Sequence, residues 1–228
     1  MTQPHHRKVR SFVQRAGRTT AAQKRAMRDL IPRFGIPFRE CTLDPGLVFG
    51  RRAPVVLDIG FGDGSALLTL AANHPANDYL GIEVHEPGIG HLLLQLQRAG
   101  LENVRIIPHD AVEVVRHMLS PRRVDAVNLF FPDPWPKKRH HKRRIVQPGF
   151  VHDIARVLKP GGTFHIATDW ADYAEHAASV MDDCEQFEAL SPQQASSEPF
   201  FDRPTTKFER RGIALGHTVT DLHFRRID

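Results

Sequence analysis

Residues 54 to 64 read PVVLDIGFGDG, and they are the most informative part of the chain about its fold. A short apolar run, rich in β-branched residues and too short for a helix, leads into three glycines at alternate positions, Gly60, Gly62 and Gly64. A segment with apolar residues at helical spacing follows from Ser65. Such glycines allow a tight turn and the close approach of a ligand at the edge of a parallel sheet. The stretch therefore predicts a strand, a ligand-binding turn and a helix.

The residues around this turn indicate which ligand binds there. The dinucleotide fingerprint G-x-G-x-x-G is broken, because Ser65 stands where a glycine or alanine is needed, and this disfavours NAD. Glu83 ends the second predicted strand, where an acid can accept hydrogen bonds from both ribose hydroxyls. Asp110 follows the third strand and could accept from the exocyclic amino group of an adenine. Together they predict an adenosine ligand without a demonstrated diphosphate.

Short apolar runs alternate with helix-length segments as far as residue 170, which predicts an α/β fold with a mostly parallel, doubly wound sheet. Residues 191–206 are rich in proline and serine and predict a long surface loop. Residues 217–226 alternate and predict a late antiparallel strand near one end of the sheet. We expect strands at 54–60, 78–84, 103–108, 123–131 and 163–169, and helices at 65–74, 89–99, 111–119, 149–158 and 171–182.

Charge is segregated along the 228 residues, whose net charge is +5. Residues 1–28 hold eight Lys or Arg and no acid, and residues 137–144, KKRHHKRR, hold six more. The rest of the chain is acidic. Clustered cations of this kind favour a large polyanion as the partner, because they displace counterions from phosphates, although a solvated tail and loop would look the same. We divide the chain into a basic arm of little periodicity, 1–40, which we expect to order only on a partner, and a domain, 41–228.

Other features bound the function. No run approaches the ~18 apolar residues of a membrane span and no secretory signal opens the chain, so we expect a cytoplasmic protein that does not meet a membrane. Cys41 and Cys184 lie far apart and predict reduced thiols. The 14 histidines show no metal-binding spacing, so we expect no metal. The sequence leaves a monomer and a homodimer both open.

The order of glycine turn and acids resembles that of class I S-adenosylmethionine methyltransferases. The resemblance sharpens in residues 130–144, FFPDPWPKKRHHKRR, which are similar to the bacterial tRNA (guanine-N7-)-methyltransferases. Supporting segments run from the arm almost to the C-terminus: RSFVQRAGR at 10–18, LDIGFGDG at 57–64, GIEVHEPG at 81–88, HDAVEV at 109–114, ATDWADYAEH at 167–176 and TKFERRG at 206–212. One departure is Asp58, where other members also carry glutamate.

The resemblance implies a seven-stranded, Rossmann-like sheet, S-adenosylmethionine as cofactor, and methylation of N7 of a guanosine in the tRNA variable loop. It implies that Asp133 is the catalytic residue. The implied cofactor-binding residues are Asp58, Gly60, Gly62, Glu83, Asp110 and Asp133. The implied substrate-binding residues are Lys137, Asp169, Thr206, Lys207, Phe208 and Glu209, and the implied RNA contacts are Arg139, His140, His141, Lys142, Arg143 and Arg144.

The chemistry of such a reaction can be argued from the residues. Guanine N7 carries a free lone pair, so its attack on a sulfonium methyl group needs no base, and positioning and electrostatics do the work. Asp133 and Asp169, each at a strand end, could stabilise the positive charge that develops on the purine; a turn residue and a helix N-cap are the structural alternatives. Methylation of another RNA or base nitrogen, and a non-catalytic RNA-binding protein, remain the competing functions.

Overall fold

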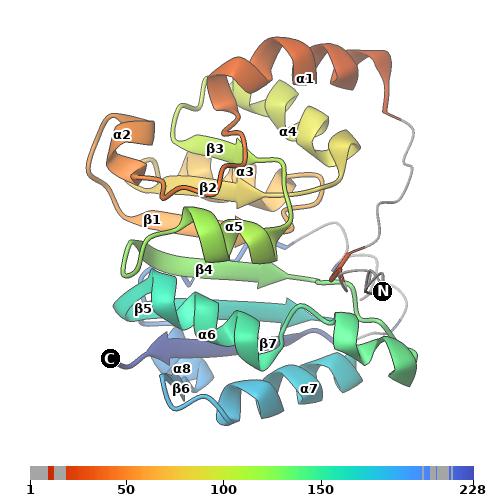
Figure 1. The fold of residues 1–228 in the computed structure, drawn as a ribbon, viewed down its shortest axis with the longest axis vertical. Coiled ribbons are helices and arrows are strands. Elements are labelled where there is room, and N and C mark those ends of the chain that lie inside the picture. Colours follow the sequence, from red (N-terminus) through yellow and green to blue (C-terminus); the bar gives the residue numbers. More distant parts are fainter. Residues whose placement is uncertain (1–9, 13–18, 202, 206–208, 210–215, 217) are drawn as a thin grey trace, which may run out of the picture.

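The computed structural model describes residues 10–12, 19–201, 203–205, 209, 216 and 218–228, and within them a single seven-stranded sheet (Figure 1). Its order is β3-β2-β1-β4-β5-β7-β6. The first five strands run parallel, and β7 is antiparallel to both β5 and β6. The strands are β1 (Val55–Ile59), β2 (Asp78–Ile82), β3 (Val104–Ile107), β4 (Val124–Phe130), β5 (Leu158–Thr168), β6 (Phe187–Ala189) and β7 (Thr220–Arg226).

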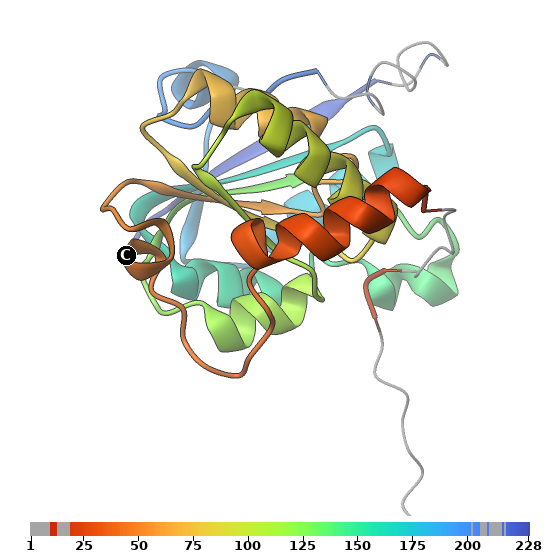
Figure 2. The ribbon, with the colours of Figure 1, turned by 90° about the horizontal axis from the view of Figure 1, so that it is seen from above.

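Helices cover both faces of the sheet and bury two apolar clusters against it (Figure 2). Helices α3 (Ser65–Asn73) and α4 (Glu86–Ala99) pack on one face, and α5 (Ala111–Met118), α6 (Pro148–Val157) and α7 (Ala171–Asp182) on the other. Short helices are α2 (Pro45–Phe49), α8 (Pro192–Ala195) and the 3₁₀ helix η1 (Lys138–Arg143). Because both faces are covered, the central strands β1, β2 and β4 are buried along nearly their whole length and are mostly apolar, as is usual for parallel strands. None of the described helices combines the length and the apolarity needed to cross a membrane.

The predicted alternation of strands and helices is confirmed, and so is the late antiparallel strand near one edge. Strand β5 begins earlier than expected, at Leu158 rather than residue 163. The sequence Lys159-Pro160-Gly161-Gly162 ends α6 as a stop signal should, but an irregular register beside β4 lets the same residues start the strand. Strand β6 and helices α2 and α8 were not predicted; all three are short, and α8 lies inside the expected loop.

Part of the predicted arm is a helix. Residues 21–34 form α1 (Ala21–Phe34), which begins with a capping box between Thr20 and Gln23. Its buried residues, Ala26, Leu30 and Phe34, recur every four positions, a period that the surrounding charges obscured. Helix α1 lies against α4 (Figure 2), where the Nε2 atom of Gln23 donates to the carbonyl of Pro87 at 3.0 Å. This segment therefore packs on the domain, contrary to the expectation of an unstructured arm there.

Close contact between these helices depends on Gly90 of α4. A Cβ atom on Gly90 would lie 2.7 Å from the Cβ and 3.0 Å from the carbonyl oxygen of Gln23, closer than such atoms approach. We expect Gly90→Ala to lower the free energy of unfolding by about 1–2 kcal/mol, because overpacking outweighs the higher helix propensity of alanine. Urea denaturation measures the change.

Gly149 of α6 is the matched control, because a Cβ atom there meets nothing within 4 Å. Gly149→Ala should leave stability unchanged or raise it by up to ~1 kcal/mol. Equal behaviour of the two variants would contradict the packing of α1 on α4.

Candidate active site

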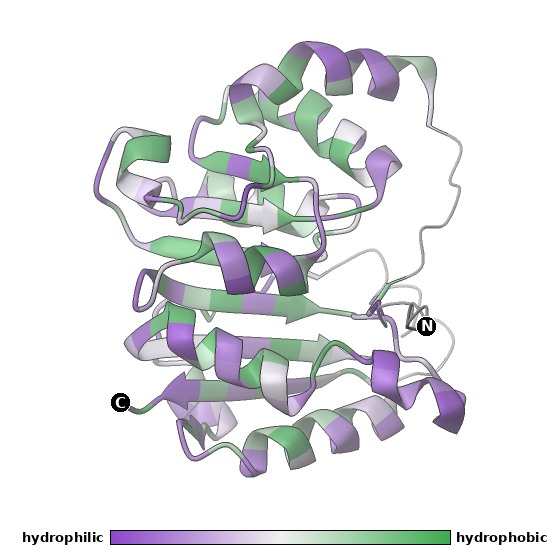
Figure 3. Ribbon diagram, in the orientation of Figure 1, coloured by the Kyte–Doolittle hydropathy of each residue, from purple (hydrophilic) through white to green (hydrophobic). Residues whose placement is uncertain are grey.

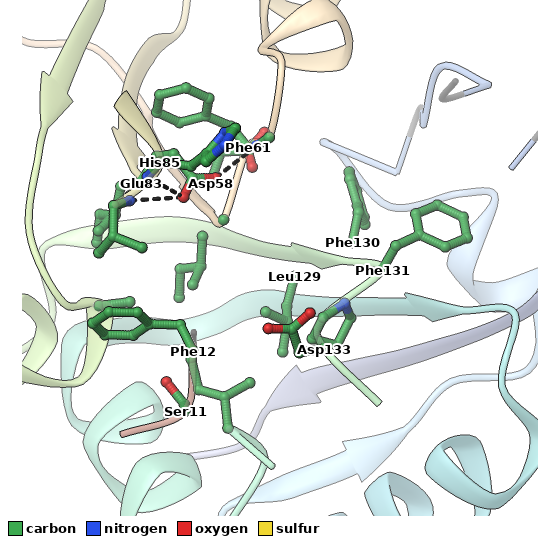
Figure 4. Close-up of a pocket in the computed structure, with 18 of the residues that line it drawn as sticks. Ser11, Phe12, Asp58, Phe61, Glu83, His85, Leu129, Phe130, Phe131 and Asp133 are labelled. Carbon is green, nitrogen blue, oxygen red and sulfur yellow. Dashed lines mark hydrogen bonds between the residues drawn. The ribbon is translucent and has the colours of Figure 1, made fainter. Parts of the chain in front are cut away.

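A cavity of about 320 Å³ lies at the carboxyl ends of β1, β2 and β4, the edge where open parallel sheets bind ligands (Figure 4). Residues from six parts of the chain line it: the N-terminal segment, the end of β1 with the glycine turn, the end of β2, the junction of β3 and α5, the end of β4 with the turn after it, and Ile145. Among them are Ser11, Phe12, Asp58, Gly60, Phe61, Gly62, Glu83, His85, His109, Phe130, Phe131 and Asp133. In Figure 4, Ser11 and Phe12 lie across the cavity from Asp58 and Glu83.

The glycine turn is shaped as the sequence predicts. Gly60, Gly62 and Gly64 have φ of 71°, 60° and 78°, left-handed values that glycine adopts without strain. A Cβ atom on Gly60 would meet nothing within 4 Å, so this part of the turn is open. A Cβ atom on Gly88, in the first turn of α4, would lie only 2.0 Å from the carbonyl oxygen of Gly62. Gly88 therefore allows α4 to close against the turn.

Two acids lie beside this turn. The Glu83 carboxylate accepts hydrogen bonds from three backbone N–H groups, those of Gly62 at 2.9 Å, Val84 at 2.7 Å and His85 at 3.0 Å. Asp58 is buried, and burial together with the nearby charge of Glu83 raises the pKa of its carboxyl group to about 7. The cavity thus holds one fixed carboxylate and one acid that ionises readily when a positive charge arrives.

Asp110 takes a different place from the other predicted acids. It is the N-cap of α5, and its Oδ1 atom accepts from the N–H of Val112 at 3.0 Å. Its neighbours His109 and Ala111 line the cavity, but Asp110 is not among the lining residues. His109 was not predicted; it stacks on Phe38 with ring centroids 3.8 Å apart. Asp110 therefore borders the cavity rather than forming its wall.

Asp133 lines the cavity from the turn that follows β4, and this turn is strained. Phe131 and Trp135, two residues before and two after Asp133, have φ of 52° and 47°. Bulky residues rarely adopt this left-handed conformation, which costs roughly 1–3 kcal/mol each and persists only when the surroundings hold it. The N–H of Phe131 donates to the carbonyl of Ala167 on β5 at 2.7 Å, which fixes the start of the turn.

Arg144 fixes the second half of the turn. Its Nε atom donates to the carbonyl of Pro134 at 3.0 Å, and its guanidinium pairs with Asp172 and lies over the ring of Tyr173. Arg144 is only 2% exposed. This placement departs from the predicted RNA contact, because a guanidinium that is buried and hydrogen-bonded in this way does not reach a phosphate.

Arg143 also has a role that its place in a basic run did not indicate. Its guanidinium lies 3.7 Å from the ring centroid of Trp135 and donates to the carbonyls of Arg10 and Phe12, at 2.9 Å each. The indole Nε1 atom of Trp135 donates to the carbonyl of Ser11 at 2.9 Å. Residues 10–12 are thereby docked beside Asp133, at the wall of the cavity. No local pattern could have indicated this contact, because it joins segments more than 120 positions apart.

The lysines of the basic run and Arg139 face solvent. Lys137, Lys138, Arg139 and Lys142 are exposed, whereas His140 and His141 are half-buried. Helix η1 is a strongly hydrophilic segment on the side of the sheet where the cavity lies, at the carboxyl ends of the parallel strands (Figure 3). Four cations thus stand beside the turn that carries Asp133.

The remaining predicted substrate residues are dispersed. Asp169 lies between β5 and α7, does not line the cavity, and is not the N-cap of α7, which is Trp170. Glu209 is buried and paired with Arg203. Thr206, Lys207 and Phe208 lie outside the described residues.

Among the described residues, one cluster of potential metal ligands was not predicted from the sequence. His165, Asp221 and His223 offer ligand atoms that all lie within 4.8 Å of one another. They come from neighbouring strands, with His165 paired directly to His223 across β5 and β7. Spacing along the chain could not reveal them, because 56 positions separate His165 from Asp221.

Comparison with known proteins agrees with this geometry. Residues 52–222 match the protein family described as "Putative methyltransferase". The chain is 53% identical over 226 residues to a protein of Halorhodospira halophila named tRNA (guanine-N(7)-)-methyltransferase, covering 99% of this chain and 97% of that one. It is 51% identical over 222 residues to the protein of the same name from Burkholderia vietnamiensis, covering 97% of this chain and 86% of that one.

Among solved structures, the 16S rRNA methyltransferase KamB has the same fold, with a TM-score of 0.54 and 16% identity over 94% of this chain and 97% of that one. At such low identity this likeness concerns the fold alone. The two sequence relatives, similar over nearly their whole length, decide the family. This chain belongs to the family of the tRNA (guanine-N(7)-)-methyltransferases.

Proposed function

We propose that this protein transfers the methyl group of S-adenosylmethionine to N7 of a guanosine in the variable loop of tRNA. The observation that carries the proposal is the position of Asp133. Its turn brings a carboxylate into the cavity that the glycine turn, Asp58 and Glu83 also line, and exposed cations follow directly in the chain. An adenosine-type site, an acid and a polyanion-binding surface thus meet at one edge of the sheet.

The residues present fit the methyl donor. Gly60 leaves room against the backbone. The Glu83 carboxylate accepts two backbone hydrogen bonds at Oε1 and one at Oε2, so Oε2 has one lone pair left to accept from a hydroxyl of a ribose diol. Asp58 would face positive charge on the donor, and ionisation of its carboxyl group would accompany binding. When bound, S-adenosylmethionine supplies an electrophilic methyl group on a positively charged sulfur atom.

Asp133 would act by electrostatics and orientation. Guanine N7 is already a nucleophile, so no residue has to remove a proton before the methyl group moves. The purine becomes positively charged as it is methylated, and a carboxylate held in advance beside the base stabilises that charge without rearrangement. The clamped turn keeps Asp133 in place, which is the condition for such stabilisation.

The first test is methylation itself. Incubation with unmodified tRNA and labelled S-adenosylmethionine should give 7-methylguanosine in the variable loop. Asp133→Asn keeps the shape of the side chain and removes its charge, so the single-turnover rate should fall by at least ~100-fold. Nucleoside analysis of the RNA identifies the product.

Another methylated nucleoside would favour a different base nitrogen, and tRNA binding without any methylation would favour an RNA-binding protein. A folded Asp133→Asn protein with a near-normal rate would show that the carboxylate is only a part of the turn.

A second prediction concerns the pH dependence of donor binding. Below its pKa of about 7, Asp58 is protonated and must lose a proton before it can face a cation. Affinity for S-adenosylmethionine should therefore rise by about 25-fold between pH 5.5 and pH 7.5, in step with the ionised fraction of Asp58. In Asp58→Asn this rise should disappear. Calorimetry in buffers of different ionisation enthalpy would detect the released proton, and equal pH dependence in the two proteins would refute the assignment.

A third prediction concerns the exposed cations of the basic run. Neutralising Lys138, Arg139 and Lys142 together should weaken tRNA binding and flatten its salt dependence, by about 0.7–0.9 in the slope of log affinity against log salt for each lost phosphate contact. Affinity for the methyl donor should stay the same. Titrations at several salt concentrations give the slope.

The matched control neutralises three exposed arginines near the opposite edge of the sheet, Arg52, Arg98 and Arg123. This control should keep the wild-type slope. If both triple variants behave alike, the basic run is a solvated loop and the RNA is held elsewhere.

A further inference from the structure

One buried arginine ties the C-terminal segment to the sheet beside the cavity. Arg203 exposes only 10% of its side chain. Its Nη1 and Nη2 atoms donate to the Glu209 carboxylate at 2.6 and 2.9 Å, and its Nε and Nη2 atoms donate to the Asp221 carboxylate at 2.8 and 3.0 Å. The planar guanidinium thus makes a double contact with each of two acids, a geometry that lysine cannot reproduce.

The same guanidinium lies close to the start of the Asp133 turn. Its Cζ atom is 5.8 Å from the ring centroid of Phe130 and 5.6 Å from that of Phe131. Phe130 ends β4, and Phe131 is the first of the two residues held in the left-handed conformation. In Figure 4 both phenylalanines lie on the side of Asp133 away from Ser11 and Phe12. Arg203 therefore supports the turn from the side opposite the N-terminal segment.

Further contacts hold Arg203 itself in place. Asp221 of β7 also accepts from the Nε2 atom of His165 on β5, at 2.7 Å, and the His165 ring meets Phe130 edge-on at 4.9 Å. Burial lowers the pKa of His165, so the neutral ring donates this hydrogen bond. Burial alone would raise the pKa of Asp221. The hydrogen bonds from His165 and Arg203 outweigh this effect and lower the pKa below its usual value, so the carboxylate stays ionised.

This network also involves two of the three residues in the cluster of His165, Asp221 and His223. A metal ion at that place would need the Asp221 oxygens, and both already accept hydrogen bonds from Arg203. The guanidinium supplies the positive charge that a metal ion would bring. His165 and Asp221 are therefore better explained as residues that hold Arg203 than as metal ligands, and His223 contacts the His165 ring, with the ring centroids 4.0 Å apart.

We infer that Arg203 is a positioning residue for methyl transfer: it holds Phe131 in its left-handed conformation, so that Asp133 faces the cavity, and fixes the Glu209 carboxylate beside the same turn. The inference rests on the proposed function for the role of Asp133. Arg203 acts through the turn and does not have to touch the donor or the guanine.

The test is Arg203→Lys, which keeps the charge but loses the planar fork and the flat face toward the two rings. The single-turnover rate of tRNA methylation should fall by at least about tenfold, since a displacement of about 1 Å at a reacting group can cost about 100-fold. The affinity for S-adenosylmethionine should change by less than about twofold, because backbone groups beyond the reach of Arg203 fix Glu83.

Arg225→Lys is the matched control. Arg225 lies on β7, as Asp221 does, and it also bridges two acids, Glu188 and Glu198. It pairs with Thr163 near the opposite edge of the sheet. Arg225→Lys should keep the wild-type rate. A wild-type rate in Arg203→Lys, or an equal loss in both variants, would overturn the inference.

A second readout needs no turnover. The ¹⁹F resonance of 5-fluorotryptophan at Trp135, assigned with Trp135→Phe, reports on the turn directly. It should shift in Arg203→Lys and stay in place in Arg225→Lys; an unshifted resonance in Arg203→Lys would overturn the inference. Because this measurement is independent of RNA, it distinguishes a failure of the inference from a failure of the proposed function, which the wild-type methylation assay shows by itself.

Discussion

The site depends on one strained turn. Phe131 and Trp135 are both held in a conformation that large side chains avoid, and Asp133 lies between them. An isolated peptide with this sequence would relax, since each such residue costs roughly 1–3 kcal/mol. The turn persists because β5, Arg144 and the docked residues 10–12 hold its backbone and its tryptophan from several sides. Strain of this kind makes the position of the carboxylate sensitive to every segment that holds it.

The basic residues around the turn fall into two groups, those that bind other parts of the protein and those that face solvent. Arg144 is buried and binds the protein's own carbonyls and carboxylates, and Arg143 holds the N-terminal segment against Trp135. Lys138, Arg139 and Lys142 are left exposed on the same short helix. Helix η1 begins only five residues after Asp133. A polyanion that bound to the exposed cations would therefore act close to the turn, and in the proposed function RNA binding would be coupled to the position of the acid.

Asp58 and Glu83, the two acids beside the glycine turn, also shape the electrostatics of the cavity. Glu83 is fixed by three N–H groups, and its charge acts on the buried carboxyl group of Asp58. Two adjacent carboxyl groups in a poorly solvated place favour a positively charged ligand, because a cation relieves their mutual repulsion.

The fold class, the glycine turn and the acids beside it could be predicted from the amino-acid sequence. These features are local: β-branched runs, glycines at alternate positions and acids at strand ends each act within a few residues, and the parallel sheet then brings the strand ends to one edge. The sequence could not show that α1 packs on α4, that Arg144 is buried, or that Arg203 joins Glu209 to Asp221. A run of six cations looks uniform in one dimension. Only the tertiary structure decided which of them meet carboxylates and carbonyls inside the protein and which face solvent, because that depends on contacts between segments far apart in the chain.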